Sequence, residues 1–427
     1  MKFTQSIFAA AFAFAAAAAF AAPVTTQGVG VGKHGDIQVA VTFDNGKIQK
    51  IDILKNAENP VLAKKVFTDL KDQIVAANSV QLDGISGATF TSKGLFAAVE
   101  DAAKKAGVTL GQADKKALKA AVKDLPKNAS YDVVVIGAGG AGFSAAIEAK
   151  NAGATVVLLE KMPQVGGNSL ISGAEMNAAK NWVQPKLGIT DDSPELHAKD
   201  TYLGGDKKGD MKVINVMTHN ALAGAEWCRD YLGVRFEPDN LFFFGGHSRK
   251  RALIPVGHTG TEFITKFQAK ADELGIPVIT NMKAEELIKD KSGRVVGVKA
   301  TMNGAEYSFN AKGGVVLATG GFGANPAMVK KYNPKIDERF KTTDAPGTTG
   351  EALYMAQRAG AELVNMQYIQ TYPICDPISG VIELIADARF DGAIMLNQEG
   401  KRFVEELGRR DVLSEAILDQ TGGYCWV

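Results

Sequence analysis

One glycine-rich turn in the sequence has the spacing needed to bind a pyrophosphate. It lies between an apolar run and a stretch with helical spacing, and it reads Gly137-Ala138-Gly139-Gly140-Ala141-Gly142. Gly137 permits a tight turn, Gly139 lets the backbone approach phosphates, and Gly142 lets the helix pack closely on the strand. The helix N-terminus carries a partial positive charge that attracts phosphates. The turn therefore predicts a dinucleotide site; the alternative is a glycine turn without a ligand.

The residues after this turn indicate which dinucleotide binds. A second apolar run, 155–159, ends in Glu160, whose carboxylate would accept hydrogen bonds from ribose hydroxyls and would exclude NADP. The polar glycine loop 166–169 and the strand and glycine turn 315–323 favour FAD over NAD, because both would return the chain to a flavin. The residues predicted to bind FAD non-covalently are Gly137, Gly139, Gly142, Glu160, Lys161, Gly166, Gly167, Asn168, Ser169, Thr319, Gly320 and Gly321.

A second polar, glycine-rich loop precedes another helical stretch. It reads Asp83-Gly84-Ile85-Ser86-Gly87-Ala88-Thr89-Phe90-Thr91-Ser92. Such a loop exposes hydroxyl groups at the start of a helix, where they can either take part in chemistry or cap the helix. The residues themselves leave both interpretations open.

Two kinds of element must position these loops. Strand patterns at 28–31, 37–43 and 48–54, with the hairpin turn Asp44-Asn45-Gly46, predict a small antiparallel sheet. Helical spacing over 61–75 and 92–105 completes a compact α+β module. From residue 131 strands and helices alternate, which predicts an α/β domain of the Rossmann type around the first loop.

Composition narrows the function further. The chain has 427 residues, with 48 Lys and Arg against 47 Asp and Glu, so no net field indicates binding to nucleic acid. Its three cysteines are too widely spaced for a CxxC metal site or a CxxCH haem site; they are Cys228, Cys375 and Cys425. We therefore expect no metal and expect flavins to carry the electrons of any redox reaction.

The N-terminus has the pattern of a secretory signal peptide. Lys2 precedes the apolar run 7–20, and Ala19-Phe20-Ala21 gives a small-x-small cleavage pattern. The alternative, a membrane anchor, is disfavoured because the run is shorter than the roughly 20 residues of a spanning helix. The sequence predicts removal of residues 1–22 and a periplasmic location.

From about residue 130 to its end, the chain resembles the fumarate reductase and succinate dehydrogenase flavoprotein family. The glycine turns at 137–142, 166–169 and 319–323 carry this resemblance. It implies a FAD domain joined to a capping domain that contacts the substrate, and the capping domain is expected to be incomplete here. The domains implied are a signal peptide (1–22), an FMN-binding domain (23–107), a linker (108–129), a FAD-binding domain (130–368) and the start of the capping domain (369–427).

The loop at 83–92 resembles the flavin acceptor of FMN-binding domains in bacterial redox proteins. In those domains the threonine that closes the D-G-x-S-G-A-T motif takes FMN through a phosphoester. The resemblance implies covalent FMN on Thr89, with Thr91 as the alternative, attached by a flavin transferase. It also implies that a periplasmic or membrane-bound donor reduces FMN, which then reduces FAD.

Four stretches share the frame of the family's reduction site: 367–373, 385–389, 399–403 and 409–411. By position, the resemblance makes Arg410 the acid that protonates the carbon beside the substrate carboxylate, while FAD delivers hydride to the other alkene carbon. Because arginine has a reference pKa above about 12, a proton relay is needed, and we expect Arg389 to belong to it. The alternative is that Arg410 is a surface residue at the start of a helix.

Three departures from the family's frame predict the substrate. Tyr372 replaces a histidine that grips a dicarboxylate, and Asp387 and Glu175 add acidic groups. Two added carboxylates would repel the second negative end of fumarate, but they suit an imidazole ring. The pattern resembles the branch of the family that reduces urocanate to imidazole propionate, with Asp387 and Glu175 on the ring nitrogens and Tyr372 beside the ring.

Two other functions remain open at this stage. One is reduction of fumarate or another 2-enoate. The other is a non-catalytic periplasmic flavoprotein that carries electrons, since the family's later substrate-binding motifs are not in this sequence. Of the remaining features, the run Phe242-Phe243-Phe244 is interpreted as core, and His247 and His258 are interpreted as exposed loop residues.

Overall fold

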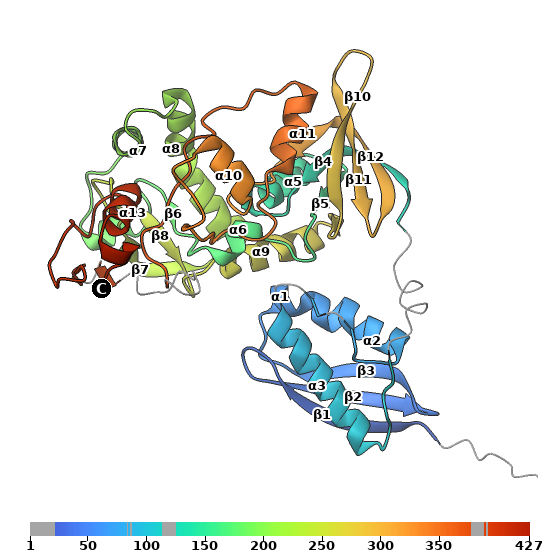
Figure 1. The fold of residues 1–427 in the computed structure, drawn as a ribbon. Helices are drawn as coiled ribbons and strands as arrows, with labels where there is room; N and C mark the ends of the chain where they lie inside the picture. Colours follow the sequence, from blue (N-terminus) through green and yellow to red (C-terminus); the bar gives the residue numbers. More distant parts are fainter. Residues whose placement is uncertain (1–21, 83, 86–87, 113–124, 377–387, 390–391) are drawn as a thin grey trace, which may run out of the picture. The chain divides into compact units, whose positions relative to one another are not determined.

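The computed structural model describes residues 22–82, 84–85, 88–112, 125–376, 388–389 and 392–427. Residues 1–21 of the predicted signal peptide, residues 113–124 of the predicted linker and the predicted substrate residue Asp387 lie outside the described residues. The chain divides into two compact units, Met1–Asp124 and Leu125–Val427, each of which is described by itself (Figure 1).

The first unit is a three-stranded antiparallel sheet with a long helix on one face. The strands run in the order β1 (Val24–Val31), β2 (Asp36–Asp44), β3 (Lys47–Lys55). Asn45 and Gly46 both have positive φ in the turn between β2 and β3, as the predicted hairpin requires. The remaining elements are α1 (Pro60–Lys65), the π-helical turn η1 (Val66–Leu70), α2 (Lys71–Ala77) and α3 (Thr89–Lys105).

Period-two alternation and two glycines build the core of this unit. Alternate residues of β2 are buried, and they are Ile37, Val39, Val41 and Phe43. Helix α3 packs on β1 and β2. A Cβ at Gly28 or Gly30 would lie within 2.1 Å of a backbone oxygen of α3, so only glycine allows this close approach. The predicted α+β class is confirmed.

The second unit is built on a six-stranded sheet in the order β10-β11-β12-β4-β5-β9, in which β12, β4, β5 and β9 are parallel. Helix α5 (Gly140–Asn151) connects β4 to β5, which confirms the predicted Rossmann-type arrangement. The strands are β4 (Asn128–Ile136), β5 (Val156–Leu159), β9 (Val278–Ile279), β10 (Lys283–Lys289), β11 (Val295–Met302) and β12 (Ala305–Leu317).

A smaller sheet and several helices complete this unit (Figure 1). The sheet has the order β6-β8-β7, with β6 (Met176–Asn177), β7 (Phe236–Phe242) and β8 (Ala252–Pro255). The α-helices are α6 (Gly167–Ile171), α7 (Pro194–Gly204), α8 (Met211–Glu226), α9 (Thr261–Glu273), α10 (Pro326–Tyr332), α11 (Glu351–Ala359) and α13 (Arg410–Leu418). Short 3-10 and π turns are η2 (Gln184–Leu187), η3 (Trp227–Tyr231) and η5 (Thr421–Gly423).

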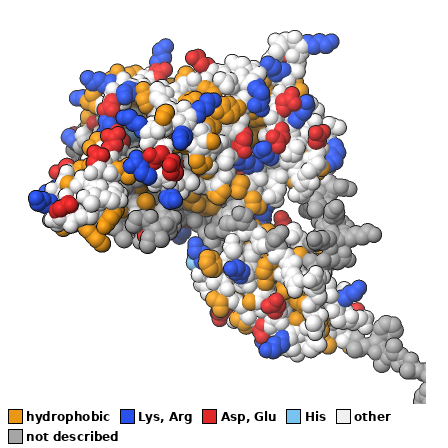
Figure 2. Space-filling view, viewed as in Figure 1, with side chains coloured by type: hydrophobic (Ala, Val, Ile, Leu, Met, Phe, Trp, Pro, Cys, Tyr) orange, Lys and Arg blue, Asp and Glu red, His pale blue; other side chains and the backbone are white. Residues whose placement is uncertain are grey.

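The C-terminal segment has its own small apolar cluster. Helix α13 contributes Leu413 and Ile417, which pack with Ile374 and Met395. This cluster fixes the helix that begins at Arg410. Over the described part of the chain, no helix is both long and apolar enough to cross a membrane. On the face seen in Figure 2, acidic and basic side chains are interspersed.

Candidate active site

Two glycines of the turn after β4 are crowded by the protein itself. Gly137 has φ of +101°, and a Cβ there would lie 2.4 Å from the carbonyl oxygen of Ala318. A Cβ at Gly142 would lie 1.8 Å from the carbonyl oxygen of Gly137. Gly137 therefore permits the tight turn beside β12, and Gly142 permits helix α5 to pack against that turn.

Three other glycines at this edge of the sheet have open surroundings. A Cβ at Gly139 would meet no atom closer than 3.6 Å, and one at Gly320 or Gly321 would meet nothing within 4 Å. Gly139 is the N-cap of α5 and has no side-chain cap, although the amide of Gly140 donates to Ser169 Oγ at 3.1 Å. Open backbone beside a helix N-terminus fits a bound pyrophosphate, so the residues present fit FAD.

Glu160 follows β5 and is held beside the same turn. Its carboxylate accepts hydrogen bonds from the amides of Ala138 at 2.9 Å and Met162 at 2.8 Å. Gly166 lies across the turn, where its amide donates to the carbonyl of Ala138 at 2.7 Å. The acidic group is therefore placed where the ribose of a dinucleotide would lie.

Lys161 and Asn168, both predicted to bind the cofactor, contact the segment 345–351, which the sequence did not single out. Lys161 Nζ lies 2.9 Å from the carboxylate of Glu351 and donates to the hydroxyl of Thr349. Burial alone would raise the pKa of Glu351, but hydrogen bonds from Thr349 and Lys161 outweigh it and lower the pKa to about 2. Asn168 Oδ1 accepts from the amide of Ala345 at 2.6 Å.

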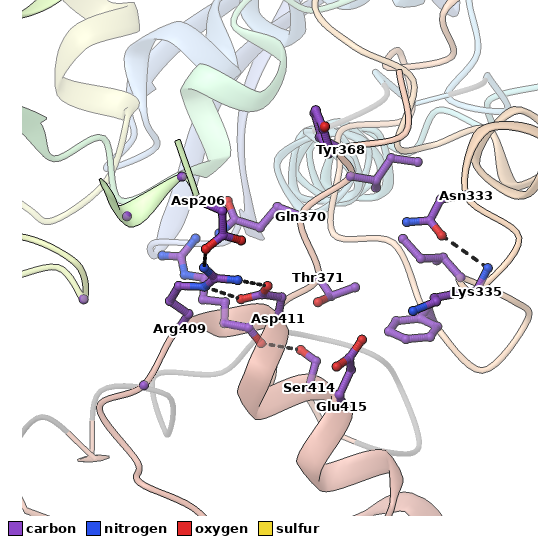
Figure 3. Close-up of a pocket in the computed structure, with 18 of the residues that line it drawn as sticks. Asp206, Asn333, Lys335, Tyr368, Gln370, Thr371, Arg409, Asp411, Ser414 and Glu415 are labelled. Carbon is purple, nitrogen blue, oxygen red and sulfur yellow. Dashed lines mark hydrogen bonds and ion pairs between the residues drawn. The ribbon is translucent and has the colours of Figure 1, made fainter. Parts of the chain in front are cut away.

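A cavity of about 1440 Å³ in the second unit brings together residues from segments that are far apart in the sequence (Figure 3). Three predicted site residues line it: Glu175, just before β6, Arg389, and Arg410 at the start of α13. The guanidinium carbon of Arg410 lies 5.0 Å from the centre of the Tyr372 ring, within cation–π distance. Four of the five predicted catalytic and substrate residues therefore lie in or beside one cavity, and Asp387 is outside the described residues.

The surroundings of these residues differ. Arg389 is 5% exposed, whereas Arg410 is half-buried and is the first residue of α13. Glu175 follows Ala174, a non-glycine residue with φ of +59°. The turn at Ala174 is thus held in a strained left-handed conformation next to the cavity.

The structure corrects two predictions: that the run of three phenylalanines belongs to the core, and that His247 is exposed. Phe244 lines the cavity and Phe243 is exposed, so the run of three phenylalanines is not core. His258 is exposed, but His247 is half-buried and its Nδ1 lies 3.0 Å from the guanidinium of Arg251. The two glycines directly after the run, Gly245 and Gly246, and the polar residues 247–251 that follow them were the available signal that this run ends at a surface.

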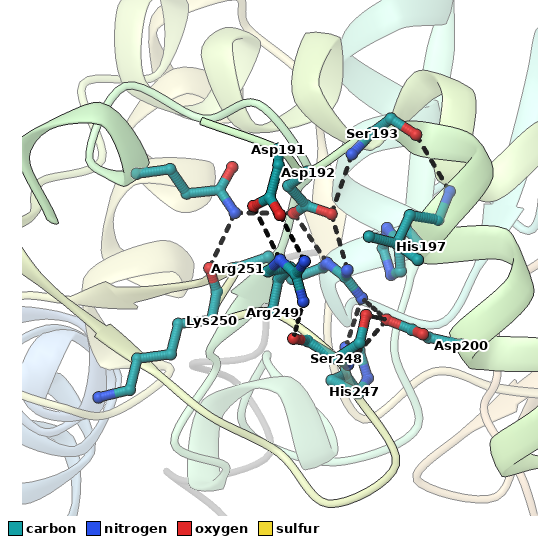
Figure 4. Close-up of polar contacts among 12 residues, drawn as sticks. Asp191, Asp192, Ser193, His197, Asp200, His247, Ser248, Arg249, Lys250 and Arg251 are labelled. Atoms are coloured by element: carbon teal, nitrogen blue, oxygen red, sulfur yellow. Dashed lines mark hydrogen bonds and ion pairs between the residues drawn. The ribbon is translucent and has the colours of Figure 1, made fainter. Parts of the chain in front are cut away.

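The second unit also contains a buried ionic cluster that the sequence did not predict (Figure 4). The Arg251 side chain is fully buried and makes two hydrogen bonds to Asp192, at 3.0 and 2.7 Å, and one to Asp200, at 2.8 Å. Asp200 lies on α7 and also accepts from the amide and hydroxyl of Ser248. The cluster therefore fixes α7 to the loop that contains Phe244.

Two histidines of this cluster are neutral near pH 7. Burial lowers the pKa of His197 to about 4, and the nearby charge of Arg251 acts in the same direction. Burial and Arg251 also lower the pKa of His247. His197 and His247 have ring centres 5.7 Å apart, so a proton on either one would disfavour a proton on the other.

In the first unit, the two candidate threonines have different environments. Helix α3 begins at Thr89, and its N-cap residue, Ala88, has no side-chain cap. Thr89 is exposed, whereas Thr91 is 4% exposed and donates to the buried carboxylate of Glu58. Of the two threonines, Thr89 thus presents its side chain to solvent and Thr91 has its hydroxyl satisfied inside.

Comparisons with known proteins agree with this division of the chain. A family model described as an FAD binding domain matches residues 132–424, and one described as an FMN-binding domain matches residues 32–104. The chain is 43% identical over 402 residues to a urocanate reductase from Eggerthella lenta, covering 93% of this chain and 66% of that protein. It is 33% identical to an NADH:acrylate oxidoreductase from Vibrio harveyi, covering 92% of this chain and 45% of that protein.

A solved structure shares its fold with about three quarters of this chain. It is the open conformation of a flavocytochrome c3 fumarate reductase, with a TM-score of 0.62 and 33% identity. The match covers 74% of this chain and 55% of that one. This chain therefore spans about half to two thirds of the length of these proteins.

Proposed function

Because the chain belongs to the fumarate reductase and succinate dehydrogenase family of FAD-binding flavoproteins and carries an N-terminal FMN-binding domain, we propose that it reduces the carbon–carbon double bond of an unsaturated acid. The relatives described above are named as reductases of urocanate, acrylate or fumarate. The observation that carries the proposal is the cavity, which Glu175, Arg389 and Arg410 all line.

The charges around this cavity favour urocanate over a dicarboxylate. The guanidinium groups of Arg389 and Arg410 suit one carboxylate. Glu175 in the same cavity would repel a second carboxylate but can accept a hydrogen bond from an imidazole N–H. The ring of Tyr372 beside Arg410 offers a flat apolar surface, and Asp387 would be the second acidic group. The product would be imidazole propionate.

The chain's own residues would bind the cofactor and supply the proton. When bound, FAD supplies hydride chemistry for one alkene carbon. The open glycines 139, 320 and 321 and the carboxylate of Glu160 would hold the dinucleotide. Arg410 gives a proton to the alkene carbon beside the substrate carboxylate, and Arg389, buried in the same cavity, belongs to the relay that restores it.

The first unit would deliver electrons through covalently bound FMN. The exposed side chain of Thr89 is the proposed attachment point for a flavin transferase, and the burial of Thr91 against Glu58 supports this choice. A covalent bond keeps the flavin on an exported protein. We place the mature protein in the periplasm, where a periplasmic or membrane-bound donor would reduce it.

Oxidation of a reduced viologen dye by added substrates tests the reductase function. We expect turnover with urocanate and none with fumarate or acrylate. Arg410→Lys should abolish turnover while the FAD content, measured from the flavin absorbance, stays unchanged, because lysine lacks the planar guanidinium. Turnover with fumarate alone would replace urocanate as the substrate, and flavin binding without any turnover would favour the electron-carrier alternative.

Mass spectrometry of protein made with the flavin transferase tests the FMN site. We expect one FMN-sized adduct on the peptide that contains Thr89. Thr89→Ala should remove the adduct, and Thr91→Val should leave it. An adduct that survives Thr89→Ala and disappears with Thr91→Val would move the attachment to the buried threonine.

A further inference from the structure

Arg409, the residue before Arg410, joins two carboxylates at the edge of the cavity (Figure 3). Its Nε lies 3.0 Å and its Nη2 lies 2.5 Å from the carboxylate oxygens of Asp411, and its Nη1 donates to Asp206. These hydrogen bonds raise the pKa of the Arg409 guanidinium above its usual value. Asp206 is 203 residues away in the sequence, so this side chain connects two distant segments.

Asp206 lies on a well-supported loop. It follows the C-cap of α7, Gly205, and adopts a left-handed conformation with φ of +54°. Asp200, six residues earlier and within α7, is hydrogen-bonded to Arg251 and Ser248 in the buried cluster. The acidic partner of Arg409 is thus anchored through α7 to the interior of the fold.

A second close contact joins the same two regions. A Cβ at Gly245 would lie 3.3 Å from the carbonyl oxygen of Leu407. Gly245 belongs to the loop that Ser248 and Arg251 fix to α7. The segment 407–411 therefore meets both α7's loop and the loop after β7.

The backbone of Arg409 also determines where α13 begins. Arg409 is the N-cap of α13, and its carbonyl accepts the amide of Leu413 at 3.0 Å. The carbonyl of Arg410 accepts the hydroxyl of Ser414 at 2.8 Å. A shift of Arg409 would consequently move the first turn of the helix and the guanidinium of Arg410 with it.

We propose that Arg409 is a positioning residue: its pairing with Asp206 and Asp411 holds the first turn of α13 against the loop after α7 and thereby keeps Arg410 at the cavity. Asp206 and Arg409 act as a latch between the loop after α7 and the C-terminal segment of the second unit. The kinetic consequence rests on the proposed function, whereas the latch itself does not.

Hydrogen exchange of the α13 amides tests the latch without using activity. In the full chain, Arg409→Gln and Asp206→Asn should each speed exchange at Leu413 and Ser414 by about two- to fivefold, the range expected for an exposed ion pair. The double variant should exchange no faster than Arg409→Gln alone, because that substitution already removes the contact with Asp206. The matched control is Arg249→Gln, since Arg249 has the same 36% exposure as Arg409 and pairs with Asp191 rather than with Asp206 or Asp411.

Steady-state kinetics then separates positioning from general loss of structure. Arg409→Gln should lower kcat for the enoate about tenfold or more, as expected when a proton donor is displaced, and should change KM less than twofold. Arg409→Lys should recover part of this loss, because an ammonium can still meet one carboxylate. Unchanged α13 exchange in both single variants, or effects that simply multiply in the double variant, would overturn the latch. Retained turnover in Arg410→Lys would instead remove Arg410 as the acid and leave the exchange result standing.

Discussion

Arg251 and Arg409 each pair with two aspartates, but they do so in different surroundings. Arg251 is fully buried, with Asp192 and Asp200 at 1% and 9% exposure. Arg409 is 36% exposed, and Asp206 is 50% exposed. Burial makes a lost partner costly, because the remaining charges cannot regain water, whereas an exposed pair is largely screened. The pairing of Arg251 with two aspartates therefore maintains the fold, whereas the similar pairing of Arg409 orients its neighbour Arg410.

Removal of Arg251 should have the largest effect on stability. Arg251→Met leaves Asp192 and Asp200 buried without their cation, so we expect the free energy of unfolding to fall by about 3–5 kcal/mol. Arg409→Met should lower it by less than about 1 kcal/mol. Urea unfolding followed by tryptophan fluorescence measures both. Similar losses in the two variants would show that burial does not distinguish the two arginines.

As the pH is lowered, His197 of the buried cluster should lose its stabilising effect at a higher pH than the carboxylates of the same cluster do. His197 has a pKa of about 4 in the folded protein against an ordinary value of 6.5, so the unfolded chain binds more protons between these values. The free energy of unfolding should therefore fall by about 2–3 kcal/mol as the pH is lowered from 7 to 4.5. His197→Gln should reduce this dependence in urea unfolding at the two pH values.

The carboxylates of the cluster respond in a different pH range. Burial would raise the pKa of Asp192, but hydrogen bonds from Arg251 and Gln184 outweigh it, and the pKa lies below its ordinary value of 3.8. The stability that Asp192 contributes is lost only below about pH 4.

His258→Gln is the matched control for His197→Gln, since His258 is 62% exposed. If the control loses as much acid dependence as His197→Gln, the buried imidazole is not its source.

Salt should produce the smallest effect and only at the exposed latch. Raising sodium chloride from about 0.1 to 1 M shortens the Debye length from about 10 to 3 Å and weakens the pair between Arg409 and Asp206. We expect exchange at Leu413 to rise about twofold, with no change in β8, which carries the residues next to Arg251. Hydrogen exchange at the two salt concentrations measures both regions. Equal acceleration in β8 would indicate a general effect of salt.

Local patterns predicted much of the fold. Alternating apolar residues identified the strands of the first sheet, because successive side chains of a strand point to opposite faces. Asp44-Asn45-Gly46 identified the turn, because Asn and Gly readily adopt the positive φ angles of a hairpin. The strand, turn and helix around Gly137–Gly142 followed from spacing for the same reason. A resemblance, rather than spacing, supplied Glu175, Arg389 and Arg410, and the structure brings these three residues to one cavity.

Other parts of the site depend on contacts that no short pattern contains. Arg251 lies 59 residues from Asp192 and 51 from Asp200, and Arg409 lies 203 from Asp206. Nothing in the spacing of these residues indicates that they meet. The run Phe242-Phe243-Phe244 shows that composition alone can also mislead. Its residues are typical of a core, yet β7 ends at Phe242 and Phe244 lines the cavity.

The sequence by itself determined the two glycine-rich loops and the elements on either side of them, because these depend on residue type and local backbone conformation. Only the tertiary structure decided which of the two candidate threonines, Thr89 or Thr91, is exposed to solvent, since Thr91 is buried and donates to Glu58 from another part of the chain. It also decided which arginine supports the fold and which lines the cavity, because the energy of a charge depends on the water and partners that folding leaves around it.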